Sequence, residues 1–272
     1  ALMDEGYKPE KTVFCNGKFT LKGADHKYRC WRKEGHGSLN LHRALVKSCN
    51  VYFYNLALDL GYKKVVQLAR QFQFSSKTGI DLPGEVSSQL STPSWKRNQL
   101  GEPWYQGDAI NAIIGQGYTL ISPVKQAQLM GELLTGRSIT PRVASVPGEK
   151  GKSPHVDIPK KVRKRFRKTL DQVTETGTGY WAQHTPDWQK IHPDVIGKTG
   201  TVQKVRTDNS GDTPPSDAWF ISAAPVENPQ YVVVVFRAEA GSGGQAAAPH
   251  ARKIYQFMDQ LNYFPEPESE TS

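Results

Sequence analysis

Three short runs of apolar and β-branched residues in the last third of the chain restrict its possible folds more than any other feature. The runs cover 194–202, 218–224 and 231–237, and turn-forming residues separate them. Such runs are typical of β-strands, and three in succession indicate an antiparallel meander. Because a helical pattern follows over 249–261, we expect a fold of the α/β class, α+β in type, in which an antiparallel sheet packs between helices.

Helices are expected in the part of the chain before these strands. Capping residues and apolar spacing predict helices over 41–47, 51–60, 63–73, from 123 onward and over 160–174. Asn40 is a suitable N-cap for the first of them. Residues 7–37 are polar and rich in Lys and Gly, which favours irregular loops with short strands. The triplet Ser48-Cys49-Asn50 therefore lies at a junction between two helices.

Composition places the chain among folded globular proteins. Its 272 residues are 37% hydrophobic and 22% charged, which supplies a large core and excludes an intrinsically disordered chain. We expect one domain over 1–264 and an acidic tail over 265–272, because no flexible linker divides the middle of the chain. The net charge of +9 favours anionic neighbours such as membrane surfaces, acidic polymers or nucleic acid.

The start of the chain has the sequence of a helix end. Residues 1–6 read as a last helical turn closed by Gly6, with Pro9 just beyond. No stretch is apolar enough to span a membrane, and no signal peptide opens the chain. We therefore interpret the chain as part of a longer protein, in which any anchor, export signal or preceding domain lies upstream.

Two groups of polar residues are suited to acyl transfer. Lys198-Thr199-Gly200-Thr201 lies on the first expected strand, where the glycine allows a ligand backbone to approach and the Lys and Thr side chains can hold an anionic group. The tripeptide Lys77-Thr78-Gly79 has the same sequence as residues 198–200, but it lies in an expected loop. Upstream, Ser48 offers a hydroxyl that could relay protons, and Asn50 offers an amide that could hold a peptide carbonyl.

The order Ser48-x-Asn50 and then Lys198-Thr199-Gly200 resembles the penicillin-binding protein and serine β-lactamase superfamily, whose third element is a Ser-x-x-Lys tetrad. Further segments resemble its class B, elongation-specific D,D-transpeptidases over nearly the whole chain: Cys30-Trp31, Gly35-His36-Gly37, Tyr52-Phe53-Tyr54, 78–85, Gly115-Gln116-Gly117-Tyr118 and Ala218-Trp219-Phe220. The resemblance implies a cell-wall enzyme at the periplasmic face of the bacterial inner membrane. Such an enzyme cross-links peptidoglycan stem peptides and is acylated by β-lactams.

The tetrad is where this chain departs from the family pattern. In the family it precedes Ser-x-Asn, and nothing in residues 1–47 fits it. The one tetrad of this spelling, Ser122-Pro123-Val124-Lys125, comes after Ser48, and Ser122 is better explained as an N-cap followed by proline at the first helical position. We therefore expect the nucleophile upstream of Ala1, which would leave this chain inactive by itself.

The resemblance also implies a role for each remaining residue of the site. The upstream Ser attacks the penultimate D-Ala carbonyl, and its proton passes to the tetrad Lys, which Lys198 keeps neutral by charge repulsion. Ser48 relays a proton to the departing D-Ala, and Asn50 holds the substrate amide. Thr199 and Thr201 bind the terminal carboxylate, and the Thr201 N–H supplies half of the oxyanion hole. Gly200 lies between them on this substrate-binding strand. Taken singly, these residues have ordinary explanations as a helix cap, a turn residue and a solvated charge.

The cysteines suggest a structural metal site, although the resemblance implies no cofactor for catalysis. An odd count of three in an exported protein cannot be closed by internal disulfides. Cys15, Cys30, His36 and Cys49 together suit a tetrahedral Zn²⁺, and because Cys49 lies between Ser48 and Asn50, such a site would fix the proton-relay segment. The spacing matches no standard zinc finger. A Cys15–Cys30 disulfide with Cys49 buried, or three inert thiols, are the alternatives.

His26 and His42 are the spare ligand candidates. The basic run over 160–168 is best explained as a solvated helix face, and less well as a contact for anionic head groups, glycan strands or partner proteins. We expect no nucleic-acid binding, because no recognition fold accompanies the run.

The resemblance further implies a membrane anchor, a glycosyltransferase and shape-determining proteins as partners. Two alternatives to the transpeptidase stay open. One is a serine β-lactamase, which would need a water-activating base. The other is a non-catalytic domain that senses β-lactams or wall fragments.

Overall fold

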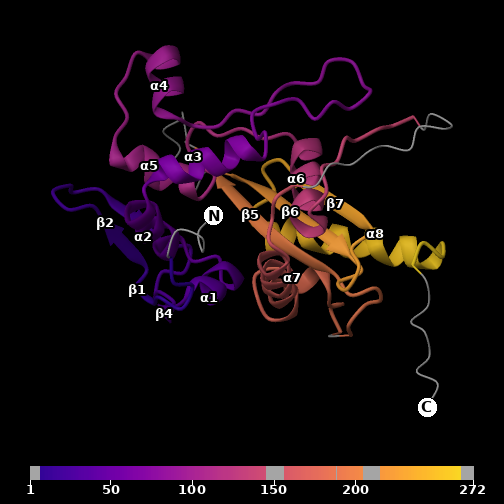
Figure 1. Cartoon of the computed structure of the whole chain (residues 1–272). Helices are drawn as coiled ribbons and strands as arrows, with labels where there is room; N and C mark the ends of the chain where they lie inside the picture. The colour runs from indigo at the N-terminus through magenta and orange to yellow at the C-terminus, as the bar shows by residue number, and fades with distance from the viewer. Residues whose placement is uncertain (1–6, 145–155, 188, 205–214, 265–272) are drawn as a thin grey trace. The chain divides into compact units, whose positions relative to one another are not determined.

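The computed structural model describes residues 7–144, 156–187, 189–204 and 215–264. The chain forms two compact units, of which unit 1 contains 1–129 and 138–156, and unit 2 contains 130–137 and 157–272. Each unit is described by itself below, with elements labelled as in Figure 1. The helical turn expected at 1–6 and the tail at 265–272 lie outside the described residues. None of the described helices combines the length and the apolar character needed to cross a bilayer.

Unit 1 joins two small two-stranded antiparallel sheets to a group of helices. Its elements are β1 (Val13–Cys15), β2 (Lys18–Thr20), β3 (Lys27–Arg29), β4 (Gly37–Leu39), α1 (Leu41–Val46), α2 (Asn50–Leu60), α3 (Tyr62–Gln71), α4 (Pro93–Leu100), α5 (Gln106–Ile113) and the first part of α6 (Pro123–Thr135). β1 pairs with β4 and β2 pairs with β3, which confirms the expected short strands. α2 supplies buried Val51 and Tyr52 to a core that also contains the three cysteines.

Capping residues explain where several of these helices begin and end. The side chain of Asn40 accepts a hydrogen bond from the Arg43 N–H at 3.0 Å, as expected of the N-cap of α1. Gly61, with φ +75°, ends α2. The sequence prediction was wrong in leaving out α4 and α5. Thr92 caps α4 by accepting from the Trp95 N–H at 3.1 Å, and Pro93 follows at the first helical position, so a start signal was present.

Unit 2 is built on a three-stranded antiparallel sheet. Its elements are the end of α6, α7 (Lys160–Glu175), a 3₁₀ turn η1 (Tyr180–Ala182), β5 (Ile196–Gln203), β6 (Ser216–Ala224), β7 (Tyr231–Arg237), a π-helical turn η2 (Gly243–Ala247) and α8 (Ala248–Gln260). The strand order β5-β6-β7 confirms the expected meander. β5 is an edge strand of this sheet, because within the described residues it pairs with β6 alone.

Helices cover both faces of the sheet in unit 2. On one face, Phe220 and its neighbours share a core cluster with Ala251 and Tyr255 of α8. On the other face, Ile196 packs against Leu170 of α7 and against the end of α6. Side chains alternate between the faces of a strand, so one strand supplies both layers. Burying a side chain as large as Phe220 contributes about 1.5–3 kcal/mol, and the expected packing of the sheet between helices is confirmed.

Candidate active site and metal cluster

Ser48 lies at the end of α1 in a left-handed backbone conformation. After the cap residue Lys47, the Ser48 N–H donates to the Leu45 carbonyl at 3.2 Å, and the Cys49 N–H donates to the Ala44 carbonyl at 2.9 Å. These two bonds form a Schellman motif, in which glycine usually occupies the position of Ser48. Ser48 nevertheless has φ +52°. The conformation costs a residue with a β-carbon about 1–2 kcal/mol, so the surroundings of Ser48 must hold it there.

Asn50 begins the next helix, α2, directly after the N-cap Cys49. Its amide Nδ2 donates to the carbonyl of Arg29 in β3 at 3.3 Å, and the hydroxyl of Tyr54 donates to the same carbonyl at 3.3 Å. Cys49, between Ser48 and Asn50, is completely buried. The two candidate catalytic side chains of unit 1 therefore lie on either side of a residue fixed in the core.

Four side chains from separate segments meet beside this residue. The ligand atoms of Cys15, Cys30, His36 and Cys49 all lie within 4.8 Å of one another. The Nδ1 atom of His36 lies 3.5 Å from Sγ of Cys30 and 3.7 Å from Sγ of Cys15. A tetrahedral zinc with Zn–S bonds of about 2.3 Å and Zn–N bonds of about 2.0–2.1 Å separates neighbouring S and N ligands by about 3.5–3.6 Å. The two separations between His36 Nδ1 and the cysteine sulfurs therefore match those of a tetrahedral site.

The two small sheets of unit 1 and the loops beside them bring these ligands together. The Cys30 N–H donates to the Gly17 carbonyl at 2.9 Å, and the His36 N–H donates to the Cys15 carbonyl at 3.0 Å. Gly35, with φ +82°, makes the second contact possible, since a β-carbon there would lie 2.2 Å from the Cys15 carbonyl oxygen. The cluster thus depends on a close backbone approach that only glycine permits.

The chemistry of this donor set also suits a soft cation. All three cysteines are buried free thiols, so the alternative of a Cys15–Cys30 disulfide does not hold in the structure. A hydrogen bond with Cys49 lowers the pKa of Cys30, and the same bond together with burial raises the pKa of Cys49. The Nε2 atom of His36 is buried and has no hydrogen-bond partner among the described residues. The spare candidate residues His26 and His42 are not members of the cluster.

The second group of expected site residues lies on β5 in unit 2. Thr199 Oγ1 and Thr178 Oγ1 are 2.7 Å apart, and Thr201 Oγ1 accepts a hydrogen bond from the Gly243 N–H at 3.2 Å. A β-carbon on Gly200 would lie 3.2 Å from Cβ of Trp219, so a larger residue would crowd the neighbouring strand. Sequence reasoning missed Thr178, although its position between Gly177 and Gly179 was a signal.

Lys198 precedes these residues on the same edge strand. Its Nζ donates to the carbonyl of Thr199 at 2.9 Å. Burial lowers the pKa of Lys198 to about 8, because the interior solvates an ammonium group less well than water does. The side chain is therefore a cation that is easily neutralised, held against the backbone of the strand that carries the two threonines.

Two segments that have the sequence of a family motif, 77–79 and 122–125, have structural roles, as expected. Thr78 donates from its N–H at 2.5 Å and from its hydroxyl at 2.6 Å to the Glu85 carboxylate, so Lys77-Thr78-Gly79 belongs to a closed loop. Ser122 Oγ accepts from the Lys125 N–H at 3.1 Å, which is the N-cap interaction. The Lys125 ammonium donates to Gln128 at 2.8 Å.

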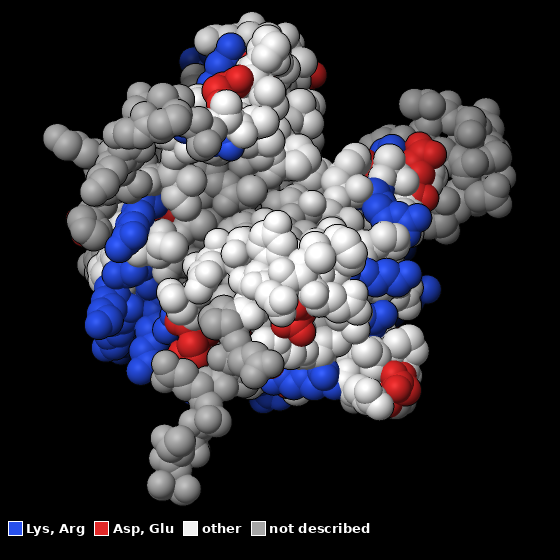
Figure 2. All heavy atoms as spheres, turned by 90° about the vertical axis from the view of Figure 1, so that its right-hand side faces the viewer, with Lys and Arg blue, Asp and Glu red and all other residues white. Residues whose placement is uncertain are grey.

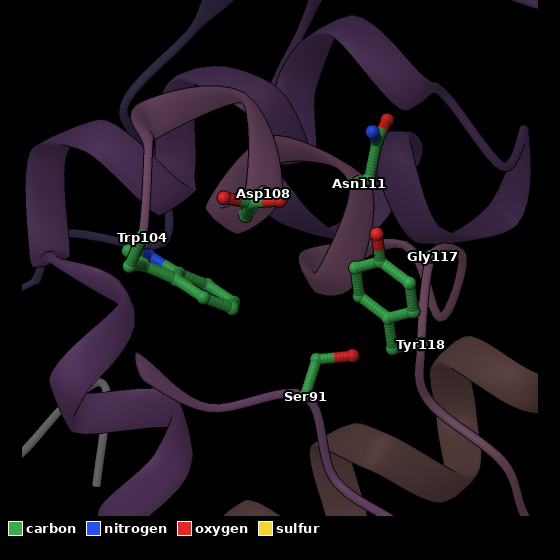
Figure 3. Close-up of a pocket in the computed structure, with 6 residues that line it drawn as sticks. All are labelled: Ser91, Trp104, Asp108, Asn111, Gly117 and Tyr118. Carbon is green, nitrogen blue, oxygen red and sulfur yellow. The ribbon is translucent and has the colours of Figure 1, made fainter. Parts of the chain in front are cut away.

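A separate cavity of about 140 Å³ lies within unit 1 (Figure 3). It is lined by Ser91, Trp104, Asp108, Asn111, Gly117 and Tyr118. Both carboxylate oxygens of Asp108 accept from the Lys96 ammonium, at 2.9 and 3.0 Å. The acidic group of this cavity is thus already neutralised by an ion pair.

Figure 2 shows Lys and Arg side chains in groups at both margins and along the lower edge of one face. Along α7, the exposed basic residues are Lys160, Lys161, Lys164, Arg165 and Lys168. Two other arginines of the run anchor the helix, Arg163 to the Thr135 carbonyl and Arg167 to the Glu227 carbonyl, each at 2.6 Å. The basic run therefore includes both structural anchors and a solvated face.

The described geometry brings the expected residues together in two groups. Unit 1 carries Ser48, Asn50 and the whole thiol-imidazole cluster, and unit 2 carries the lysine and threonines of β5. The fold and these residues define a transpeptidase-type domain, and the chain belongs to the family described as the penicillin-binding protein transpeptidase domain, which matches residues 1–256.

Curated relatives of the chain are named peptidoglycan D,D-transpeptidases. The chain is 31% identical over 270 residues to the peptidoglycan D,D-transpeptidase MrdA of Haemophilus influenzae, covering 92% of this chain and 41% of the relative. The MrdA of Acinetobacter baumannii is also 31% identical, over 269 residues, covering 89% of this chain and 38% of the relative. The chain thus spans about two fifths of the length of these curated relatives.

Solved structures of penicillin-binding protein 2 (PBP2) share the fold. PBP2 of Helicobacter pylori, in its complex with MreC, superposes with a TM-score of 0.84 at 26% identity, covering 97% of this chain and 47% of that one. PBP2 of Pseudomonas aeruginosa in complex with WCK 5153 gives a TM-score of 0.81 at 28% identity, covering 99% and 60%.

Proposed function

We propose that the protein containing this chain is a peptidoglycan D,D-transpeptidase that cross-links stem peptides through a serine acyl-enzyme and is acylated by β-lactams. The observation that carries the proposal is the Lys198-Thr199-Gly200-Thr201 strand at the edge of the sheet in a chain that matches the family over 1–256. An edge strand offers backbone groups for pairing with an extended peptide. Its lysine and threonines supply a cation and hydroxyls for a carboxylate.

The proposed mechanism assigns a role to each of the expected catalytic and binding residues. The nucleophilic Ser and its Lys are supplied by the Ser-x-x-Lys tetrad that we expect upstream of Ala1. In unit 1, the Ser48 hydroxyl passes a proton to the leaving D-Ala nitrogen, and the Asn50 amide holds the substrate amide. In unit 2, Thr199 and Thr201 bind the terminal carboxylate, and the Thr201 N–H stabilises the oxyanion. The amine of a second stem peptide then attacks the acyl-enzyme and completes the cross-link.

Lys198 has two proposed effects in this site. Its positive charge attracts the substrate carboxylate, and it disfavours protonation of the tetrad Lys, which then acts as the base. Thr178 donates to or accepts from Thr199 Oγ1, and so orients the hydroxyl that meets the carboxylate.

We propose the periplasmic face of the bacterial inner membrane as the location, with a membrane anchor upstream of this chain. The solved PBP2 of Helicobacter pylori was captured with MreC, which supports shape-determining proteins as partners. A glycosyltransferase that makes the glycan strands is the second expected partner, because cross-linking consumes its product.

We also propose that Cys15, Cys30, His36 and Cys49 hold a structural zinc ion. The fit rests on the buried ligand atoms within 4.8 Å of one another and on the three thiols, which prefer a soft or borderline cation. Such an ion would link the segment that carries Ser48 to the two small sheets of unit 1. It would take no part in the reaction, since four protein ligands leave no open position for substrate.

Labelled penicillin tests the proposed function. The protein that contains this chain and the upstream tetrad is expected to form a stable covalent adduct, whereas this chain alone is expected to remain unlabelled because it lacks the nucleophile. Ser122→Ala should change neither result, since Ser122 Oγ caps α6.

Mass spectrometry of the protein after incubation with the labelled drug is the readout. Labelling of this chain that disappears in Ser122→Ala would overturn the assignment of the nucleophile. Binding without any covalent adduct would indicate the sensor alternative, and rapid turnover of the drug would indicate a β-lactamase.

A further inference from the structure

Trp31 contacts the backbone directly before Ser48. Its indole Nε1–H donates to the carbonyl of Lys47 at 3.0 Å, across a sequence separation of 16 residues. Lys47 is the C-cap of α1, where the last helical carbonyls have no partner within the helix. The indole therefore satisfies a carbonyl that the helix itself leaves open.

This contact acts on the peptide group that sets the position of Ser48. The Lys47 carbonyl and the Ser48 N–H belong to one planar peptide unit. The N–H of that unit is held by the Leu45 carbonyl at 3.2 Å, and its oxygen is held by Trp31 at 3.0 Å. With both ends of the plane fixed, Ser48 keeps φ +52°, a value that serine does not favour by itself.

The residues around Trp31 fix the indole in turn. The Trp31 ring meets the His36 ring edge-on, with centroids 5.3 Å apart. Residue 30, directly before it, is a member of the thiol cluster, and the carbonyl of Arg29 receives the Asn50 amide at 3.3 Å. The segment 29–31 therefore holds the backbone before Ser48 and the side chain after Cys49.

Exposure shows that packing does not account for Trp31. The side chain is 58% exposed, so the core gains little from it. Trp31 is held at the surface by a hydrogen bond and a ring contact within the described residues. Its presence is better explained by the peptide group that it orients. The same exposure means that a change from Trp to Phe should leave the fold intact.

We propose that Trp31 is a positioning residue for the transpeptidase reaction, which acts by holding the Lys47–Ser48 peptide group so that the Ser48 hydroxyl meets the leaving nitrogen. The inference rests on the proposed role of Ser48 in proton relay. Without the indole N–H, the peptide plane can rotate, and the hydroxyl spends less time in the reactive orientation. Substrate affinity should not change, because the indole N–H is already engaged with the Lys47 carbonyl.

The test is a double-mutant cycle in the protein that contains this chain and the upstream tetrad. Trp31→Phe keeps the ring and removes the N–H, and Trp95→Phe makes the same change in α4 as a matched control. Acylation by labelled penicillin is followed at several concentrations, which separates the limiting rate from the half-saturating concentration. The same measurements on the parent protein and the two variants are repeated in a Ser48→Ala background.

Trp31→Phe is expected to lower the limiting acylation rate by about three- to tenfold, the range for loss of one hydrogen bond. The half-saturating concentration, thermal midpoint and metal content should stay as in the parent protein, and Trp95→Phe should change none of them. In the Ser48→Ala background, Trp31→Phe should have no further effect, because the group that it positions is gone.

An unchanged rate in Trp31→Phe would overturn the inference, and so would an equal loss in both backgrounds. If Ser48→Ala itself left the rate unchanged, the proton-relay role of Ser48 in the proposed function would fail instead. A lower thermal midpoint or lost metal in Trp31→Phe would show a purely structural role.

Discussion

Replacing Lys198 with methionine is expected to lower the rate of acylation by a β-lactam by about two to three orders of magnitude, the usual loss when one group that stabilises the transition state is removed. Methionine keeps the length of the side chain but has no charge. The substrate carboxylate then loses its cation, and the tetrad Lys is no longer kept neutral by repulsion. Stopped-flow acylation of the protein that contains this chain and the tetrad measures the effect.

The same substitution should stabilise the fold at pH 7. Burial lowers the pKa of Lys198 to about 8, from an ordinary value of 10.5. The unfolded chain therefore binds more protons than the folded one between these values, so this group makes the free energy of unfolding rise with pH across the window. Below pH 8 the buried charge carries its full cost, and Lys198→Met should raise stability at pH 7 by roughly 1–3 kcal/mol.

Lys77→Met is the matched control, because it changes the lysine of an identical tripeptide in an exposed loop. It should leave both acylation and stability near the parent values. Urea denaturation at pH 7 and pH 10 measures the stability of each variant. If Lys198→Met acylated at the parent rate, or if Lys77→Met lost as much activity, the assignment of the β5 lysine to the site would be wrong.

Removal of the metal is the second change with a large expected effect. Purified protein should contain about one zinc per chain, and a strong chelator should lower its thermal midpoint by about 10 °C, since a lost structural zinc costs several kcal/mol. His36→Ala should have the same effect without a chelator, because three thiols alone leave one corner of the tetrahedron open. Elemental analysis and thermal unfolding give the two measurements.

His26→Ala is the control for that change, since His26 is exposed and is not a member of the cluster. Its metal content and thermal midpoint should match those of the parent protein. A fully folded, metal-free preparation of the parent protein would refute the zinc site. So would a His36→Ala variant with unchanged zinc.

The strand meander and most helices could be predicted because their signals are local. Turn residues bound each strand of unit 2, and Asn40 and Gly61 mark helix ends in unit 1. α4 and α5 were missed because aromatic and turn residues over 93–113 obscure the apolar spacing. The four residues of the thiol cluster could be predicted because three thiols and an imidazole lie within one short span, a donor set that suits a tetrahedral metal site.

Other parts of the site depend on contacts between distant segments, which no local pattern records. The left-handed conformation of Ser48 occurs where sequence rules favour glycine. The hydrogen bond from Trp31 to Lys47 depends on how the segment between β3 and β4 packs against the end of α1. The contact between Thr178 and Thr199 joins a loop to a strand. Such features follow from tertiary structure and become visible only with coordinates.

A crystal structure of the protein with its upstream tetrad, trapped as the penicillin adduct, would test the account most directly. We expect the adduct's carbonyl oxygen within about 3 Å of the Thr201 N–H and its carboxylate on the threonine hydroxyls of β5. An adduct whose carbonyl oxygen lies away from the Thr201 N–H, or whose carboxylate does not meet the threonine hydroxyls of β5, would contradict the account.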